Sequence, residues 1–294
     1  MGNIATSVDE QIKKLEERGM SFDLGVEKAK EILLDIGYYR LGFYWNPFEI
    51  DHTHNFKKGT VFSDVVALYY LDVDLRNILL RSLNRIEINF RTKIVYYVSN
   101  KHKHSSTWFV DKKVMHKEFI EAFHKHYNAK FIENNRTIKL HHKKYINDKY
   151  APAWKTLEFF TFGTIFKIYT SLVEEDLKND ISKTYGLKKT KIFFNYMNTV
   201  IFIRNTCAHG GLLFDLNTPK EIAVTPLIKF NNNNNNRHSL DSAIKVILYF
   251  LSIISKDRKE EVELQIEELF SKYESNEVLN GIITKNIGYV KIVR

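Results

Sequence analysis

The chain has 294 residues, of which 44% are hydrophobic, so it can bury a sizeable core as one large domain or two small ones. Its single cysteine, Cys207, excludes a disulfide framework and a cysteine-based zinc site, and we expect a protein of the reducing cytoplasm. The formal net charge is +9, and residues 101–150 contribute +7 of it, with 12 Lys or Arg against 5 Asp or Glu. Such a segment can meet phosphate backbones or can simply be a solvated face.

Apolar residues repeat every three or four positions over much of the chain, and only 4 Pro and 12 Gly interrupt it. This pattern predicts an all-α fold, a helical bundle whose longest helix spans 60–99. The basic segment 101–150 reads as an irregular insertion. In chain order we expect helices at 7–18, 26–37, 60–99, 113–127, 153–172, 176–186, 190–209, 239–255 and 260–273, an aromatic elbow at 38–47, loops at 51–59, 212–229 and 231–236, and a strand or tail at 282–293.

Two domains follow from this reading: a main domain at 1–255 and an acidic helix with a tail at 256–294. The first 19 residues are polar and lack the apolar core of a signal peptide. The apolar stretch 243–254 is interrupted by Lys245 and is too short to span a bilayer, so we expect no membrane association.

A polar cluster ends the helix predicted at 190–209, in the sequence VIFIRNTCAHGG. Asn205 and His209 are four residues apart and therefore lie on one helix face, with Arg204 at its edge. Gly210 can adopt the left-handed conformation that stops a helix, which leaves His209 projecting from the end. The partial negative charge of a helix C-terminus favours the imidazolium form of His209.

These three residue types suit RNA cleavage by transesterification. A histidine can exchange the proton of the ribose 2′-OH, and a guanidinium matches the phosphate oxygens bidentately. Asn205 can orient the histidine or donate to phosphate. The chemistry needs neither a metal nor a cofactor, and we expect none. The alternative is structural: Arg204 would pair with a buried carboxylate and His209 would cap the last carbonyls.

The pattern Arg-Asn-x-x-x-His at 204–209 resembles the signature of the HEPN superfamily. More of the chain, from about 10 to 255, resembles one branch of it, the abortive-infection Abi-like proteins of the AbiD/AbiF type. The blocks that carry this resemblance, in order, are 37–45 (GYYRLGFYW), 75–93, 154–158 (WKTLE) and 204–210.

The resemblance implies an all-α ribonuclease in phage defence or a toxin–antitoxin system. It further implies a homodimer in which two Arg/His motifs face one cleft. A structured small RNA, encoded beside the protein, is the implied regulator. We expect RNA, and not DNA, as the partner.

Other residues have two readings each. Glu87 either forms an ordinary surface pair with Arg91 or contacts Arg204 or His209 across the bundle and holds it. The aromatic elbow is core that closes the bundle, or it leaves Arg40 free to touch RNA. The histidine pairs complete no familiar metal site, and we instead predict a phosphate-contacting patch. Its members are Lys139, His141, His142, Lys143 and Lys144.

Three functions therefore compete. The first is a metal-independent endoribonuclease with Arg204, Asn205 and His209 as catalytic residues and Glu87 in support. Its products would carry 2′,3′-cyclic phosphate and 5′-OH ends. The second is an RNA-binding scaffold that holds a small structured RNA without cutting it. The third is a purely structural protein-interaction module.

Overall fold

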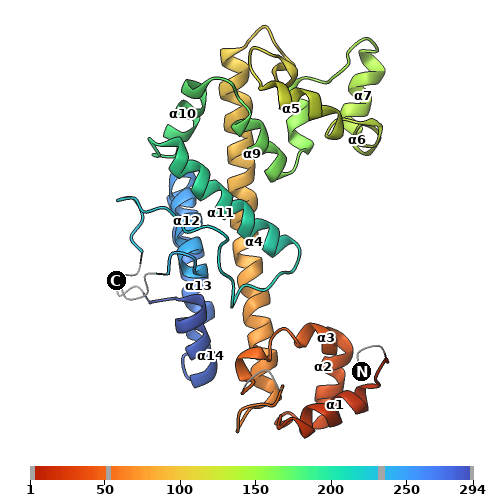
Figure 1. The fold of residues 1–294 in the computed structure, drawn as a ribbon, viewed down its shortest axis with the longest axis vertical. Coiled ribbons are helices and arrows are strands. Elements are labelled where there is room, and N and C mark those ends of the chain that lie inside the picture. Colours follow the sequence, from red (N-terminus) through yellow and green to blue (C-terminus); the bar gives the residue numbers. More distant parts are fainter. Residues whose placement is uncertain (1–3, 51–53, 231–235, 292–294) are drawn as a thin grey trace.

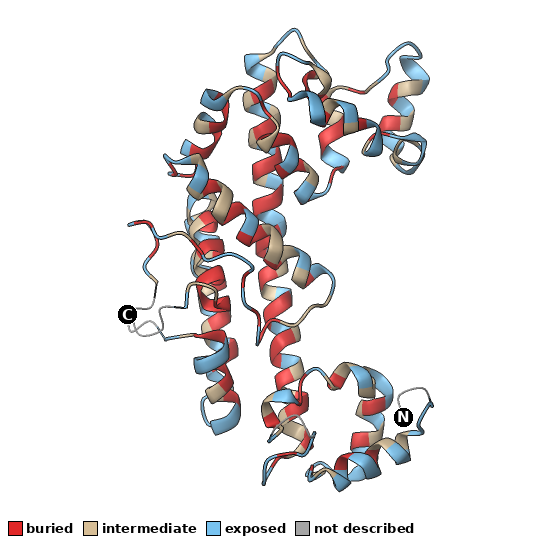
Figure 2. Ribbon diagram, in the orientation of Figure 1, coloured by how far each residue is buried: buried red, intermediate tan, exposed pale blue. Residues whose placement is uncertain are grey.

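The structure, a computed structural model, describes residues 4–50, 54–230 and 236–291. Within these ranges every regular element is a helix and the β-bridges are isolated, which confirms the predicted all-α fold. Helix α4 (Phe62–Lys101) is the spine of the molecule, and the other helices pack along it and at its two ends (Figure 1). One face of α4 is buried along its whole length (Figure 2), as its apolar periodicity predicts.

Three helices complete the central bundle. They are α11 (Thr190–Ala208), α12 (Leu240–Ile254) and α13 (Lys256–Ser271). All three pack against α4, and α12 contacts both of the others. The acidic helix predicted at 260–273 is α13, and its apolar residues Val262, Ile266, Leu269 and Phe270 are buried, so the region after 255 shares the core of the bundle.

The C-terminal stretch differs from the strand or tail expected at 282–293. Helix α14 (Glu277–Ile282) runs into a single π turn, η5 (Ile283–Ile287), which stops at Gly288 with φ +79°. Ile283 and Ile287 are four residues apart and both are buried, which favours a helical turn over a strand. Residues 292–294 and most of the asparagine run, 231–235, lie outside the described residues.

The N-terminal helices cover the start of α4. They are α1 (Val8–Glu17), α2 (Val26–Ile36), α3 (Tyr38–Leu41) and the short η1 (Asn46–Phe48). The predicted aromatic elbow begins with α3, and Leu41, Tyr44 and Trp45 are buried, as expected for core, whereas Tyr39 is 80% exposed.

The basic segment is folded, contrary to the irregular insertion that we predicted. It holds short helices: η2 (Trp108–Val110), α5 (Lys117–Ala122), η3 (Phe123–Lys125), α6 (Ala129–Asn134) and α7 (Arg136–Lys144). Trp108, Phe109 and Phe123 are fully buried and form a ring cluster. The predicted helix 113–127 begins only at Lys117, because residues 114–116 pair with the extended chain at 171–173.

The helix predicted at 153–172 is broken in two. The pieces are α8 with η4 (Ala153–Thr156, Leu157–Phe159) and α9 (Phe162–Thr170). Phe160 is extended, and the Thr161 side chain accepts the backbone N–H of Thr164, so Thr161 starts a new helix instead of continuing the old one. Helix α10 (Glu175–Lys183) follows and leads into α11.

Candidate active site at the end of α11

Helix α11 ends where the two glycines predict. Gly210 has φ +65°, and its N–H donates to the carbonyl of Cys207 (3.3 Å). The N–H of Gly211 donates to the carbonyl of Thr206 (2.8 Å), which completes a Schellman motif. His209 is therefore the C-cap, directly after the last helical residue Ala208, and is exposed to solvent.

Arg204 and Asn205 lie one turn before His209. Nη1 of Arg204 donates to Oδ1 of Asn205 (3.3 Å), and Nη2 lies 3.1 Å from Oε2 of Glu87 on α4. The Arg204 side chain is 24% exposed, and its Nε is buried without a hydrogen-bond partner among the described residues. The predicted contact between Glu87 and Arg204 is thus present, and it is also the pairing with a buried carboxylate that the structural alternative predicts.

Glu87 is a buried bridge between two arginines. Its Oε1 accepts from Nη2 of Arg91 (3.0 Å), and Arg91 also donates to the carbonyl of Phe160 and lies 3.4 Å from Glu158. The predicted pair of Glu87 with Arg91 is therefore present, but the two residues are only 6% and 9% exposed, so it is not a surface pair. A buried carboxylate between two cations holds both side chains in place, because leaving it unpaired would be costly.

A second buried ion pair lies beneath the glycine turn, and the sequence analysis did not predict it. Oδ1 of Asp72 accepts the backbone N–H groups of Leu213 and Phe214 (2.9 Å each). Oδ2 of Asp72 accepts from Arg76 and from the Tyr44 hydroxyl (3.0 Å). Asp72 is 0% exposed, so this network fixes the chain that leaves His209.

Two arginines donate hydrogen bonds to the carbonyls of the glycine turn. Nη1 of Arg76 donates to the carbonyl of Gly211 (2.9 Å), and Nη2 of Arg40 donates to that of Gly210 (2.6 Å). Arg40 also lies 3.5 Å from the Tyr44 hydroxyl. The structure therefore gives Arg40 a role in holding the turn, and its predicted contact with RNA remains a prediction.

Cys207 lies inside the motif but is suited only to packing. Its side chain is buried, and burial raises the pKa of its thiol to about 12. A thiol with that pKa is protonated at neutral pH and is a poor nucleophile.

The predicted phosphate-contacting patch is only partly on the surface. Lys143 and Lys144 are exposed at the end of α7, and Lys139 is half-buried and pairs with Glu133. In this view α5–α7 lie on the same side of α4 as the end of α11 (Figure 1).

The two histidines of that patch are tied to protein groups. His141 is 5% exposed and bonds Asp148 (3.0 Å), and burial beside Lys155 lowers the pKa of its imidazole. His142 bonds the Tyr127 hydroxyl (2.7 Å). The predicted phosphate contact of His141 is therefore wrong, because a buried neutral imidazole is not available to bind a phosphate.

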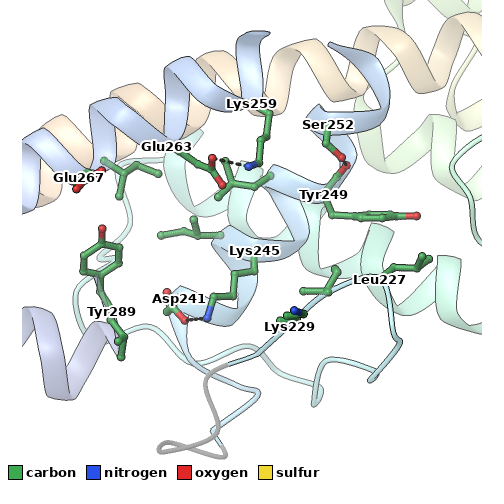
Figure 3. Close-up of a pocket in the computed structure, with 15 residues that line it drawn as sticks. Leu227, Lys229, Asp241, Lys245, Tyr249, Ser252, Lys259, Glu263, Glu267 and Tyr289 are labelled. Atoms are coloured by element: carbon green, nitrogen blue, oxygen red, sulfur yellow. Dashed lines mark hydrogen bonds and ion pairs between the residues drawn. The ribbon is translucent and has the colours of Figure 1, made fainter. Parts of the chain in front are cut away.

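A cavity of about 500 Å³ lies away from the motif, between α12, α13 and the chain at 227–229 and 289–290 (Figure 3). Two of its lysines are neutralised by carboxylates of the same cavity: Lys245 by Asp241 (2.8 Å) and Lys259 by Glu263 (2.5 Å). None of the predicted site residues lines it, and its paired charges do not suit a polyanion.

Across the described ranges, no three His, Cys, Asp or Glu side chains gather in an arrangement that could hold a metal ion. In the same ranges, no helix combines the length and apolar character needed to cross a bilayer.

A family model described as Abi-like protein matches residues 31–215, which is more than half of the chain. The match runs from α2 through the Gly210-Gly211 turn and includes Arg40, Asp72, Glu87, Arg204 and His209. It ends before α12, short of the end at about 255 that the sequence analysis expected. Searches of curated proteins and of solved structures gave no match.

Proposed function

The chain belongs to the Abi-like family, and this membership suggests a role in abortive-infection phage defence. From that premise we propose that the protein is a metal-independent endoribonuclease of the HEPN type. The observation that carries the proposal is the end of α11. Asn205 and His209 are exposed there and Arg204 is partly exposed. The buried pair of Glu87 with Arg91 holds Arg204, and the buried pair of Asp72 with Arg76 holds the turn that follows His209.

In the proposed reaction the ribose 2′-oxygen attacks the adjacent phosphorus and the bond from phosphorus to the 5′-oxygen breaks. An imidazole accepts the 2′-OH proton, and an imidazolium returns a proton to the departing 5′-oxygen. The products carry 2′,3′-cyclic phosphate and 5′-OH ends. One chain supplies one His209, and a second copy facing it in a homodimer would supply the other proton carrier.

Arg204 would stabilise the charge of the pentavalent phosphorane. Its side chain is 24% exposed, and the exposed part of the guanidinium would donate to a phosphate oxygen. Glu87 acts as a positioning residue, since it binds Nη2 and holds the guanidinium against α4. Asn205 orients the guanidinium through its Oδ1, and its amide nitrogen would donate to the substrate.

The rest of the RNA would follow exposed cations. Lys143, Lys144 and Lys139 are the proposed contacts on α7, with His142 beside them, and Arg40 adds positive charge beside the turn. A structured small RNA that regulates the protein would bind the same surface.

The direct test is RNA cleavage by purified His209→Ala and Arg204→Ala proteins with EDTA present. Both should lose cleavage by about 100-fold or more. His209→Ala should keep the thermal unfolding midpoint of the wild type, because His209 is exposed. Arg204→Ala should lower that midpoint, because it takes one cation from the buried Glu87 carboxylate, so its cleavage is assayed well below its own midpoint. His104→Ala, an exposed histidine in another segment, is the matched control and should cleave normally. Full cleavage by His209→Ala would exclude the mechanism.

Glu87→Gln separates positioning from chemistry. The amide keeps the shape of the side chain but removes the charge that holds Arg204 and Arg91, so kcat should fall more than KM rises. If the wild-type chain itself binds RNA but never cuts it, the protein is the RNA-holding scaffold instead.

A further inference from the structure

A groove of about 260 Å³ runs along α11 immediately before the candidate active site. One wall is the helix, and the other is the chain that returns from the glycine turn. The helix contributes Asn198, Ile201 and Phe202 among others, and the returning chain contributes Thr218, Pro219 and Lys220. None of these residues has a part in the reaction described above.

The returning wall is held firmly against the helix. The Asn195 side chain bonds it twice, donating to the carbonyl of Glu221 (2.9 Å) and accepting from the N–H of Ala223 (2.8 Å). Thr218 is fixed from behind by His238, through a backbone bond of 2.8 Å and a side-chain contact of 2.7 Å. The groove is therefore preformed, and a ligand would not have to order its walls.

Helical spacing places the groove in line with the catalytic residues. Phe202 lies three residues before Asn205 and seven before His209, so all three share one face of α11. At 1.5 Å per residue, Phe202 stands roughly 10 Å from His209 along the helix axis. A nucleotide next to the one being cleaved could therefore reach Phe202 while the scissile phosphate lies at His209.

The lining suits a nucleobase with its phosphate. Phe202 is partly buried against the core and leaves part of its ring in the groove, and Pro219 offers an apolar surface opposite. Asn198 is exposed and its Nδ2 donates to the carbonyl of Phe194 (2.8 Å), which leaves its Oδ1 to accept from a base edge. Lys220 is exposed and makes no ion pair with any described residue, so its charge is available to a phosphate.

We propose that this groove binds the base of an unpaired nucleotide next to the scissile phosphate, with the base against Phe202 and its phosphate near Lys220. The inference rests on the proposed function and sharpens it, because it makes single-stranded RNA the substrate class. A base in a duplex would first have to leave its stack, whereas an unpaired base enters freely.

The test measures binding in a His209→Ala background, so that it does not depend on cleavage. The probes are a short single-stranded RNA and the same strand in a duplex. Phe202→Leu keeps apolar volume but removes the aromatic face, and it should weaken single-strand binding by about 10-fold while changing duplex binding little. Lys220→Ala, which is exposed and cannot disturb the core, should weaken it as well and reduce its salt dependence.

Phe194→Leu is the matched control, since Phe194 is a partly buried aromatic of the same helix that packs on Tyr169 and lies outside the groove. Equal single-strand affinity of Phe202→Leu, Lys220→Ala and the parent would overturn the inference, as would a preference of the parent for the duplex. In either case normal cleavage by the wild-type chain would leave the proposed function intact. Loss of binding in both variants with no cleavage by the wild type would leave the groove as an RNA site and exclude the nuclease.

Discussion

Asp72 should be the most sensitive residue behind the site. In Asp72→Asn the carbonyl oxygen can still accept from Leu213 and Phe214, but the amide nitrogen then faces the Arg76 guanidinium, donor against donor. Removing one partner of a buried ion pair typically costs about 3–5 kcal/mol. For a chain of this length that corresponds to a fall in Tm of roughly 5–8 °C.

The same substitution should lower RNA cleavage at temperatures far below its Tm, because the turn after His209 loses its attachment to α4. Thermal unfolding followed by circular dichroism gives the first quantity, and a cleavage assay at 20 °C gives the second. Glu17→Gln, in the exposed pair with Lys13, is the control and should change stability by less than about 0.5 kcal/mol.

A double variant decides whether the pair works as a unit. In Asp72→Asn with Arg76→Gln the unpaired buried charge is gone, so the combined loss should fall short of the sum of the single losses by about 1–3 kcal/mol. Strictly additive losses, or an Asp72→Asn protein as stable as the wild type, would refute the reasoning about this network.

Three further predictions concern the motif and the basic segment. A methyl group at Gly211 would lie 2.7 Å from a side-chain carbon of α11, so Gly211→Ala should lower both Tm and cleavage. Gly163→Ala is the control, because the added methyl group meets open space in α9, and it should leave the free energy of unfolding unchanged or raise it by up to about 1 kcal/mol. Cys207→Ala should retain cleavage at neutral pH, since the thiol has a pKa of about 12 and is not the nucleophile; loss of cleavage in a folded variant would contradict this. Lys143→Ala and Lys144→Ala should each reduce the dependence of RNA affinity on salt, measured as the slope of log K against log salt, by roughly 0.7–0.9 if each contacts one phosphate.

Local patterns predicted the parts of the fold that depend on neighbouring residues. The apolar repeat predicted α4 and α11, and the two glycines predicted the end of α11. Both features depend on residues that are close together in the sequence. The break at Thr161 follows from a local cap, yet the many apolar and aromatic residues at 153–172 led us to predict one continuous helix. The late start of α5 could not be predicted, since it depends on pairing of residues 114–116 with residues 171–173.

The candidate site divides in the same way. Arg204 and His209 could be found from spacing, and Glu87 from a charge that interrupts an apolar stripe. Asp72 and Arg76 give that signal too, four residues apart among buried leucines, but their partners are backbone groups of the turn about 140 positions later in the chain. A sequence pattern can therefore indicate that a charged residue is buried, but its partners become known only from the fold.

The measurement that bears most directly on the central claim is the chemistry of the RNA ends. Purified wild-type protein should cut single-stranded RNA in the presence of EDTA and leave 2′,3′-cyclic phosphate and 5′-OH ends, and His209→Ala should leave the RNA uncut. Fragments with 3′-OH and 5′-phosphate ends, or cleavage that EDTA abolishes, would contradict the account.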